Sequence, residues 1–433
     1  MVRAVDALPA AVTDKPGLSR LGMGLAGLAL LALASAINAA PGTLVIVGGG
    51  LQPDNSAVYR AFIEALPDPA TSRIAVLPTA SGEPAQSVAA FIRALGRHGV
   101  SEDRVTLVKL AIKDDPSTRT VDESKWSGNA RSPTEIDKIE SAGGIWMTGG
   151  DQRRLTMLLS PESGSETPML KAVRDRLAAG AVVGGTSAGA AVMSDPMITG
   201  GDPLSSLTRK AGQPDDTTLT LGPGLGFFPV GLVDQHFGER ARLGRLAVAI
   251  ASRPNETRLG FGIDEDTALV VYLAAGQFNV AGRGNVTLLD GRKAGFSTVN
   301  GQFAALDLDL SVLSPGDSYR LADGTIVIDP SRKPTIGNEY YDDPPASGSG
   351  MAVPQPRLSR LLGSSLLDNS AATSLTRASF RDDGRAVVYR FEQTQDSAGY
   401  WGRDASDRSR YSIRSVRFSI LPATATLQII KKR

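Results

Sequence analysis

Residues 181–190 read AVVGGTSAGA, and the fold can be predicted outward from this stretch. Residues 181–183 are small and β-branched, as in a buried strand, and the glycines that follow allow a tight turn. A serine at such a turn, here Ser187, projects from the end of a sheet, and its small neighbours let a substrate approach. This arrangement is typical of a nucleophile elbow. A serine helix cap and a phosphate-binding loop are the alternatives, although the Gly-Lys-Ser/Thr of a P-loop does not follow.

The same alternation of strand and helix signals runs through the first half of the chain. Apolar strand signals, several of them ending in glycines, lie at residues 43–50, 73–78, 105–108 and 144–147. Segments with helical spacing lie at residues 56–66, 85–95 and 169–179. This βαβα alternation predicts an α/β fold with a mostly parallel sheet and helices on both faces. Ligands bind at the carboxyl ends of the strands in such sheets, so we expect the chemistry there.

The pattern changes in the last third of the chain. Segments 286–291 and 319–328 read as strands that contain or end in Asp-Gly turns. Residues 342–356 are rich in Pro, Gly and Ser, as in a linker or long loop. We therefore predict an α/β domain over residues 41–295 and a β-rich C-terminal region over residues 296–433.

The N-terminus has the layout of a secretory signal. The apolar run LGMGLAGLALLALASAI at residues 21–37 is preceded by basic residues and followed by small ones. We predict a signal peptide over residues 1–40, cleaved near Ala36 or Ala40, which makes the mature protein exported and without stable membrane association. An uncleaved anchor is the main alternative, because the run approaches the roughly 17 residues that a membrane span needs. A buried helix is the other.

Composition excludes several classes of function. The chain has 46 Lys and Arg residues against 45 Asp and Glu, a formal net charge of +1, so no global field attracts nucleic acid. There is no cysteine, which excludes disulfides and thiolate chemistry. The two histidines show no metal-ligand spacing, so we expect neither a metal site nor a cofactor.

A serine nucleophile needs a base, and the only histidines are His98 and His236. His98 lies at the apparent end of a helix, where an imidazole commonly caps carbonyl groups. His236 follows a strand-like segment and lies in a stretch with several charged residues. His236 is therefore the predicted base.

The third member of a triad is a carboxylate that orients the imidazole. Residues 262–269, GIDEDTAL, place three acids at the end of a probable strand, and Glu265 is the predicted triad acid. Asp202 and Asp234 are the alternatives. All of these acids could instead serve turn chemistry, which Asp favours.

Two further segments could complete the site. The amide of Ala188 follows the nucleophile, and the glycines of TGGDQ at residues 148–152 end another strand, so Ala188 and Gly150 are the predicted oxyanion donors. Gln152 could hydrogen-bond the substrate, whereas a plain strand-to-helix turn capped by Asp151 is the alternative. The triple glycine at residues 48–50 does not match a dinucleotide-binding GxGxxG, and we discount that function.

Four motifs together carry a family resemblance: TGGDQ at 148–152, GGTSAGA at 184–190, DQHFGERARLGRL at 234–246 and GIDEDTA at 262–268. In this combination and order the chain resembles cyanophycinases, which group with aspartyl dipeptidases among serine peptidases that have a glutamine-amidotransferase-like α/β sheet. The motifs lie between residues 148 and 268 of the chain.

The resemblance implies a Ser-His-Glu triad at Ser187, His236 and Glu265. It also implies that the pocket for a β-aspartyl-arginine unit is lined by Gln152, Asp234, Gln235, Arg240 and Arg245. Cyanophycin presents free carboxylates and guanidinium groups, and this mixture of cations, acid and amides suits both. The two arginines could alternatively belong to an exposed, salt-bridged helix.

The expected function is that of an exported serine-type exopeptidase, which hydrolyses cyanophycin to β-Asp-Arg dipeptides without a cofactor. A peptidase for short aspartyl peptides and a catalytically silent peptide-binding protein are the alternatives. The sequence is compatible with a homodimer, and it assigns no role to the C-terminal region.

Overall fold

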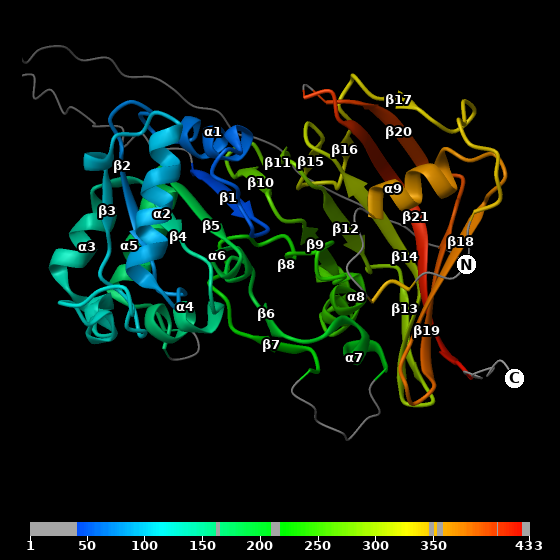
Figure 1. Ribbon diagram of the computed structural model, residues 1–433, viewed down its shortest axis with the longest axis horizontal. Coiled ribbons are helices and arrows are strands. Elements are labelled where there is room, and N and C mark those ends of the chain that lie inside the picture. Colours follow the sequence, from blue (N-terminus) through cyan, green and yellow to red (C-terminus); the bar gives the residue numbers. More distant parts are fainter. Residues whose placement is uncertain are drawn as a thin grey trace, which may run out of the picture. The chain divides into compact units, whose positions relative to one another are not determined.

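The computed structural model describes residues 41–161, 165–208, 217–345, 350–352, 358–404 and 406–426 (Figure 1). These residues belong to one compact unit, Ala39–Arg433. The predicted signal peptide, residues 1–40, and residues 346–349 and 353–356 of the predicted linker lie outside the described residues.

The first sheet has the strand order β16-β15-β11-β10-β1-β5-β4-β2-β3 in the described part of the chain. Its parallel half consists of β1 (Thr43–Val47), β5 (Val182–Thr186), β4 (Ala142–Met147), β2 (Arg73–Leu77) and β3 (Val105–Leu107). Its antiparallel half consists of β10 (Thr267–Tyr272), β11 (Gln277–Gly282), β15 (Ser318–Arg320) and β16 (Ile326–Val327). The predicted α/β class is confirmed, but only the half of the sheet that runs from β1 to β3 in the strand order is parallel. The other half begins with β10, which pairs antiparallel with β1. The glutamine-amidotransferase-like topology stays a prediction.

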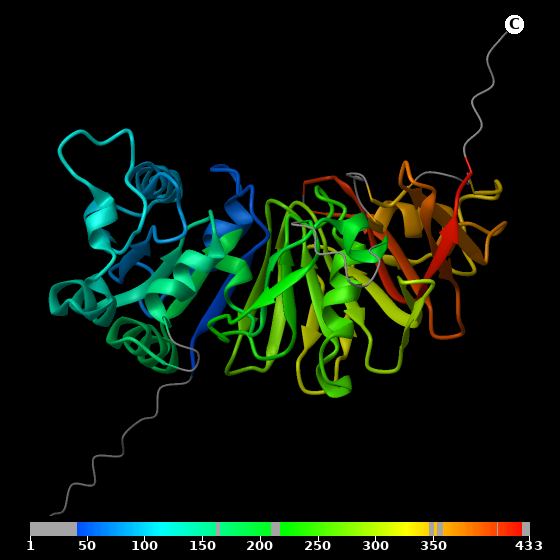
Figure 2. The same cartoon turned by 90° about the horizontal axis from the view of Figure 1, so that it is seen from below.

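Helices cover both faces of the parallel half (Figures 1 and 2). Successive residues of a strand point to opposite faces, so Val45 and Val47 share one apolar cluster with α1 and α2, while Leu44 and Ile46 share another with α3, α4 and α5. This double burial explains why β1 reads as a continuous apolar run. The helices in the described residues are α1 (Ser56–Glu64), α2 (Pro84–Arg97), α3 (Pro133–Glu140), α4 (Gln152–Leu159), α5 (Pro168–Ala178), α6 (Ala188–Ala191), α7 (Pro203–Thr208), α8 (Leu243–Ala251) and α9 (Leu358–Leu362).

The second sheet is largely antiparallel, and its first strand along the chain is β8. Its main path is β17-β20-β21-β14-β12-β9-β8, with β13 paired to β14 and the β18–β19 hairpin paired to β21. The strands are β8 (Leu232–Gln235), β9 (Leu259–Ile263), β12 (Val286–Asp290), β13 (Gly295–Val299), β14 (Gln302–Leu313), β17 (Lys333–Pro334), β18 (Ser374–Phe380), β19 (Arg385–Glu392), β20 (Ala398–Arg403) and β21 (Ser409–Thr424). A separate short ribbon joins β6 (Met197–Gly200) to β7 (Thr220–Gly222).

The predicted boundary at residue 295 does not separate two bodies. β12 lies before it and pairs with β14 beyond it, from Val286 opposite Leu313 to Asp290 opposite Asp309. β15, also beyond the boundary, pairs with β11 of the first sheet. The C-terminal region is β-rich, as predicted, but it continues both sheets.

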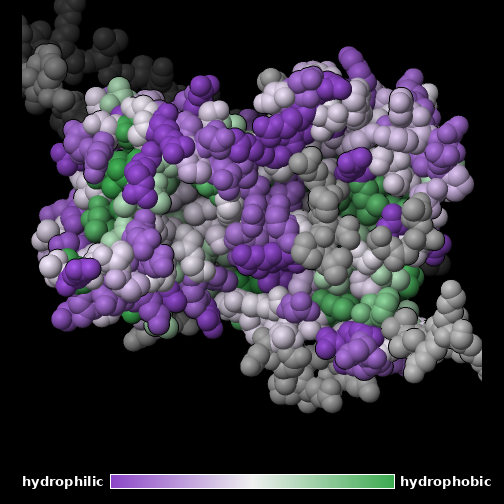
Figure 3. Space-filling model, viewed as in Figure 1, coloured by the Kyte–Doolittle hydropathy of each residue, from purple (hydrophilic) through white to green (hydrophobic). Residues whose placement is uncertain are grey.

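Part of the predicted linker is packed. The side chain of Met351 is buried, and its N–H donates to Ser379 Oγ of β18 (2.8 Å). Among the described residues, no helix combines the length and the apolar character that crossing a bilayer requires. The face of the molecule in Figure 3 is hydrophilic over most of its area.

Candidate active site

Ser187 lies in the turn between β5 and α6, at the end of the parallel half of the first sheet. Its φ of 54° and ψ of −108° are unusual for a residue other than glycine, and they give the strained turn expected of a nucleophile elbow. The Ser187 N–H donates to Val47 O of β1 (3.0 Å), which holds the turn against the neighbouring strand. The half-buried side chain therefore projects at the carboxyl edge of the sheet.

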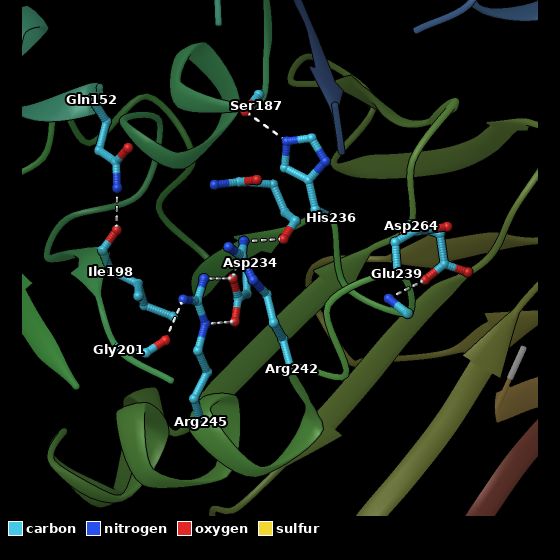
Figure 4. A network of polar contacts seen from close by, with 12 residues as sticks. Gln152, Ser187, Ile198, Gly201, Asp234, His236, Glu239, Arg242, Arg245 and Asp264 are labelled. Carbon is cyan, nitrogen blue, oxygen red and sulfur yellow. Dashed lines mark hydrogen bonds and ion pairs between the residues drawn. The ribbon is translucent and has the colours of Figure 1, made fainter. Parts of the chain in front are cut away.

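A chain of hydrogen bonds joins Ser187, His236 and Glu265. Ser187 Oγ lies 2.8 Å from His236 Nε2 (Figure 4), and His236 Nδ1 lies 2.5 Å from Glu265 Oε1. Since a carboxylate only accepts, the Nδ1–H donates to Glu265, and Nε2 is left to accept from the serine hydroxyl. This tautomer is the one that a general base for Ser187 requires.

The three residues come from two sheets. His236 follows β8 and Glu265 comes shortly after β9, and these strands are parallel neighbours with Gln235 opposite Ile263. Residues beyond them therefore leave the second sheet at one edge, whereas Ser187 leaves the first sheet. The expectation of a site built at the edge of a single sheet is wrong, because the histidine and acid strands belong to the second sheet.

Residues 48–50, for which no functional role was predicted once dinucleotide binding was discounted, contact both the histidine loop and the acid loop. Gly48 O accepts from the His236 N–H (2.6 Å), and Gly49 O accepts from the Asp266 N–H (2.8 Å). A β-carbon on Gly49, whose φ is 101°, would lie 2.3 Å from Cε1 of His236. A β-carbon on Gly50 would lie 2.6 Å from Glu265 Oε2. The only sequence signal was a triple glycine at a strand end, and its partners lie roughly 190 to 220 residues away.

The environment of His236 favours its neutral form. Burial lowers the pKa of His236 below its usual value, and the charges of Arg240 and Arg242 lower the pKa further. The hydrogen bond and charge of Glu265 raise the pKa but do not outweigh burial. The imidazole is therefore neutral at neutral pH and free to take a proton.

The loop that carries Glu265 is held by two more acids, Glu239 and Asp264, neither of which was predicted as a site residue. The Glu265 N–H donates to Glu239 Oε2 (3.0 Å). The Asp264 carboxylate accepts the N–H groups of Gly238 (2.9 Å; Figure 4) and Asn285 (3.0 Å), so it bridges the histidine loop to the start of β12. Burial, with a smaller contribution from Glu239, raises the pKa of Asp264 to about 7, although the two backbone donors oppose the shift.

The two predicted oxyanion donors, Ala188 and Gly150, each directly follow a residue of the serine turn or one that contacts it. Ala188 is the first residue of α6, and Gly149 approaches so closely that a β-carbon there would lie 3.3 Å from Ser187 Cβ. Gly150 follows with a φ of 137°, and the next residue, Asp151, caps α4 by accepting from the Arg153 N–H. The Asp151 cap that was the alternative for this segment is thus present. Gly149 nevertheless remains in contact with Ser187.

The structure pairs Asp234 and Arg245 with each other. Arg245 Nε donates to Asp234 Oδ2 (2.8 Å), Arg245 Nη2 donates to Oδ1 (2.5 Å), and Arg242 lies 3.4 Å from Oδ1 (Figure 4). Asp234 is only 1% exposed and Arg245 only 5%. Both were expected to line the substrate pocket, but their charged groups are occupied by one another. The alternative, an exposed and salt-bridged helix, is also wrong for Arg245, because its side chain is buried in α8.

The other predicted pocket residues differ in how far they are engaged. Gln152 Nε2 donates to Ile198 O (2.8 Å; Figure 4). Gln235 Oε1 is buried and has no hydrogen-bond partner among the described residues. Arg240 is exposed and close enough to His236 to lower its pKa. Arg240 is therefore a predicted pocket residue whose charge is exposed to a ligand, whereas the free oxygen of Gln235 is buried.

The alternative acid Asp202 and the other histidine, His98, lie outside this network. Asp202 Oδ1 accepts from Leu204 N and Ser205 N at the start of α7. His98 ends α2, where its Nε2 lies 3.0 Å from Pro53 O and its ring stacks on Tyr59. Neither contacts Ser187 or His236. Asp202 takes the turn role given as its alternative, whereas the His98 ring contacts a carbonyl outside its own helix. The remaining constellation can perform acyl transfer through a covalent serine intermediate.

Comparison with known proteins agrees with this chemistry. The model of peptidase family S51 matches residues 44–274. A cyanophycinase of Synechococcus elongatus is 39% identical over 199 residues, which are 45% of this chain and 57% of that protein. A cyanophycinase of a Nostoc species is 33% identical over 260 residues, 59% of this chain and 77% of that protein. The chain thus spans little more than half the length of the first relative.

Among solved structures, a peptidase from an acI-B1 actinobacterium has a TM-score of 0.44 and 20% identity. The similarity covers 65% of this chain and 98% of that one.

Proposed function

Because this chain belongs to peptidase family S51, we propose that it is an exported serine-type exopeptidase that hydrolyses cyanophycin to β-Asp-Arg dipeptides. The observation that carries the proposal is the hydrogen-bonded series from Ser187 Oγ through His236 to Glu265. The strained turn at Ser187 and the neutral imidazole support the same chemistry.

In the proposed reaction, Ser187 Oγ attacks the scissile carbonyl carbon while His236 Nε2 takes the hydroxyl proton. The negative charge on the carbonyl oxygen is stabilised by the N–H groups of Ala188 and Gly150. His236 then returns the proton to the leaving amine as the C–N bond breaks. A water molecule, deprotonated by His236, attacks the acyl-enzyme and releases the product acid. Glu265 stabilises the protonated imidazole in both steps.

The substrate is proposed from the relatives' names and from the charges at the site. Each unit of cyanophycin carries a free carboxylate and a guanidinium group. The exposed Arg240 can pair with the carboxylate. The buried ion pair of Asp234 and Arg245 holds the end of β8, from which the loop with His236 and Arg240 continues.

Export is proposed on the apolar run at residues 21–37 and the small residues after it. N-terminal sequencing of the protein from its native host tests this part separately. A new terminus near residue 37 or residue 41 is expected, and an intact Met1 on cytosolic protein would refute export.

The activity is tested by incubating the purified protein with cyanophycin and identifying the products by mass. Release of β-Asp-Arg by the natural protein, and its loss in Ser187→Ala, is the expected result. Cleavage of short aspartyl peptides without cleavage of the polymer would favour the alternative peptidase. Binding of peptides without any turnover or labelling by a serine-directed reagent would identify a silent binding protein.

A further inference from the structure

A cleft of about 1010 Å³ opens in the C-terminal region, away from the residues of the catalytic triad. It is lined by residues of β17, β20, β21 and α9 and by the segment after β17, which Figure 1 shows together at one side of the second sheet. Single small-molecule sites are usually about 300–1,000 Å³, so this cleft has room for more than one dipeptide unit.

Three solvent-exposed aromatic side chains line the cleft. Trp401 and Tyr341 are each 38% exposed, and Tyr340 is 82% exposed. The rings of Tyr340 and Tyr341 meet edge to face with centroids 5.0 Å apart. Exposed ring faces of this kind attract guanidinium groups by cation–π contact.

The same cleft carries cations that are available to a ligand. Lys333 and Arg360 both line it, and neither forms an ion pair with any described residue. Asp368, the one acid among the described lining residues, is already engaged, since Asp368 Oδ2 accepts from Tyr411 Oη–H (2.6 Å) and Oδ1 accepts from Tyr340 N–H (2.8 Å). The cleft therefore offers ring faces to cations and Lys333 and Arg360 to carboxylates.

Two residues that line the cleft are connected by hydrogen bonds and an ion pair to the loop that bears the triad acid. Asn285 lines the cleft and donates its N–H to Asp264 Oδ2 (3.0 Å). Arg410 lines it as well and donates to Arg283 O (2.7 Å), while Arg283 pairs with Asp266 (3.0 Å). Asp264 and Asp266 flank Glu265, so the cleft backs onto the active-site loop.

We propose that this cleft is a second binding site for the polymer, which holds a stretch of the chain that is not being cleaved. The rings of Trp401, Tyr340 and Tyr341 take the guanidinium groups, and Lys333 and Arg360 take the free carboxylates. A neutral glycan would use the rings but would leave both cations without partners. The inference rests on the proposed function, because it assigns the cleft the same zwitterionic substrate.

The test uses a variant that combines Trp401→Ala, Lys333→Gln and Arg360→Gln in the full chain. In a Ser187→Ala background, co-sedimentation with cyanophycin should weaken roughly tenfold, as expected for the loss of one cation–π contact and two ion pairs. In the active protein, kcat/KM should fall on the polymer but not on a two-unit β-Asp-Arg peptide. Phe380→Ala with Lys293→Gln, an exposed aromatic and an exposed cation outside the cleft lining, is the matched control.

The outcomes separate the cleft from the catalytic function. Unchanged sedimentation of the cleft variant, or equal losses on long and short substrates, would overturn the second site even if wild-type protein cleaves the polymer. Loss of binding to a neutral polysaccharide, with polymer binding intact, would overturn it too. Wild-type protein that cleaves neither substrate, but sediments with the polymer only when the cleft is intact, would retain the cleft and refute the hydrolase.

Discussion

Gly49 and His236 are in such close contact that a β-carbon at residue 49 would lie 2.3 Å from the imidazole Cε1. Gly49→Ala should therefore displace the ring from Ser187 and lower kcat at least about 100-fold, because a misplaced catalytic group costs that much. Steady-state kinetics on the substrate that the wild type cleaves best measures the effect.

Gly99→Ala is the matched control for Gly49→Ala. Gly99 has a similar φ, 87° against 101°, but a β-carbon there meets no atom within 4 Å. Both variants carry comparable backbone strain, and only Gly49→Ala should lose activity. Equal activity in the two variants would show that His236 does not depend on this contact.

Glu265→Gln should reduce kcat by roughly 10²- to 10⁴-fold with little change in KM, because the amide can stabilise the wrong imidazole tautomer. Asp202→Asn is the comparison, since Asp202 only caps α7. Near-normal turnover in Glu265→Gln together with a large loss in Asp202→Asn would reassign the triad acid.

Arg240→Gln should move the acid limb of the kcat/KM profile to higher pH. The charge of Arg240 lowers the pKa of His236, so its removal raises that pKa, and more protons must be withdrawn before the base is free. Measured pH profiles of Arg240→Gln and of Arg119→Gln, an exposed arginine that does not contribute to the His236 pKa, decide the point. A shift to lower pH in Arg240→Gln would contradict the electrostatic account.

Asp234→Asn should act mainly on stability. It leaves the buried guanidinium groups of Arg245 and Arg242 without their carboxylate, and breaking such a pair costs about 3–5 kcal/mol. Denaturant unfolding measures the loss, and Asp383→Asn, at the solvent-exposed pair with Arg385, should leave the free energy of unfolding nearly unchanged. Normal stability with weakened substrate affinity would instead support direct recognition by Asp234.

A chain of residues 41–295 should fail to fold cooperatively, whereas residues 41–433 should fold. Truncation would expose the edge of β12 that pairs with β14, and it would remove Tyr319, which stacks on Phe278 at 5.1 Å. Thermal melting followed by circular dichroism compares the two chains. A sharp transition for residues 41–295 would restore the boundary expected from the sequence.

Much of the site could be predicted because its chemistry lies in short motifs at strand ends. Ser187 could be predicted from the strand, glycines and small residues around it. His236 could be predicted as its base because the chain has only one other histidine. The preference for Glu265 rested on a strand end, and the structure brings that residue, and not Asp202 or Asp234, to the imidazole.

By itself, the sequence determined the α/β class, the strand-to-helix turn at Ser187 and the residue types of the triad, since apolar periodicity and turn chemistry act over a few neighbouring residues. Only the tertiary structure decided that β8 and β9 belong to a second sheet, that Gly49 supports His236 and that Asp234 is buried against Arg245. Pairing between distant strands depends on which edges and side chains meet after the chain has packed. A local pattern carries no record of that choice, so Asp234 looks the same in sequence whether its carboxylate faces a substrate or an arginine of α8.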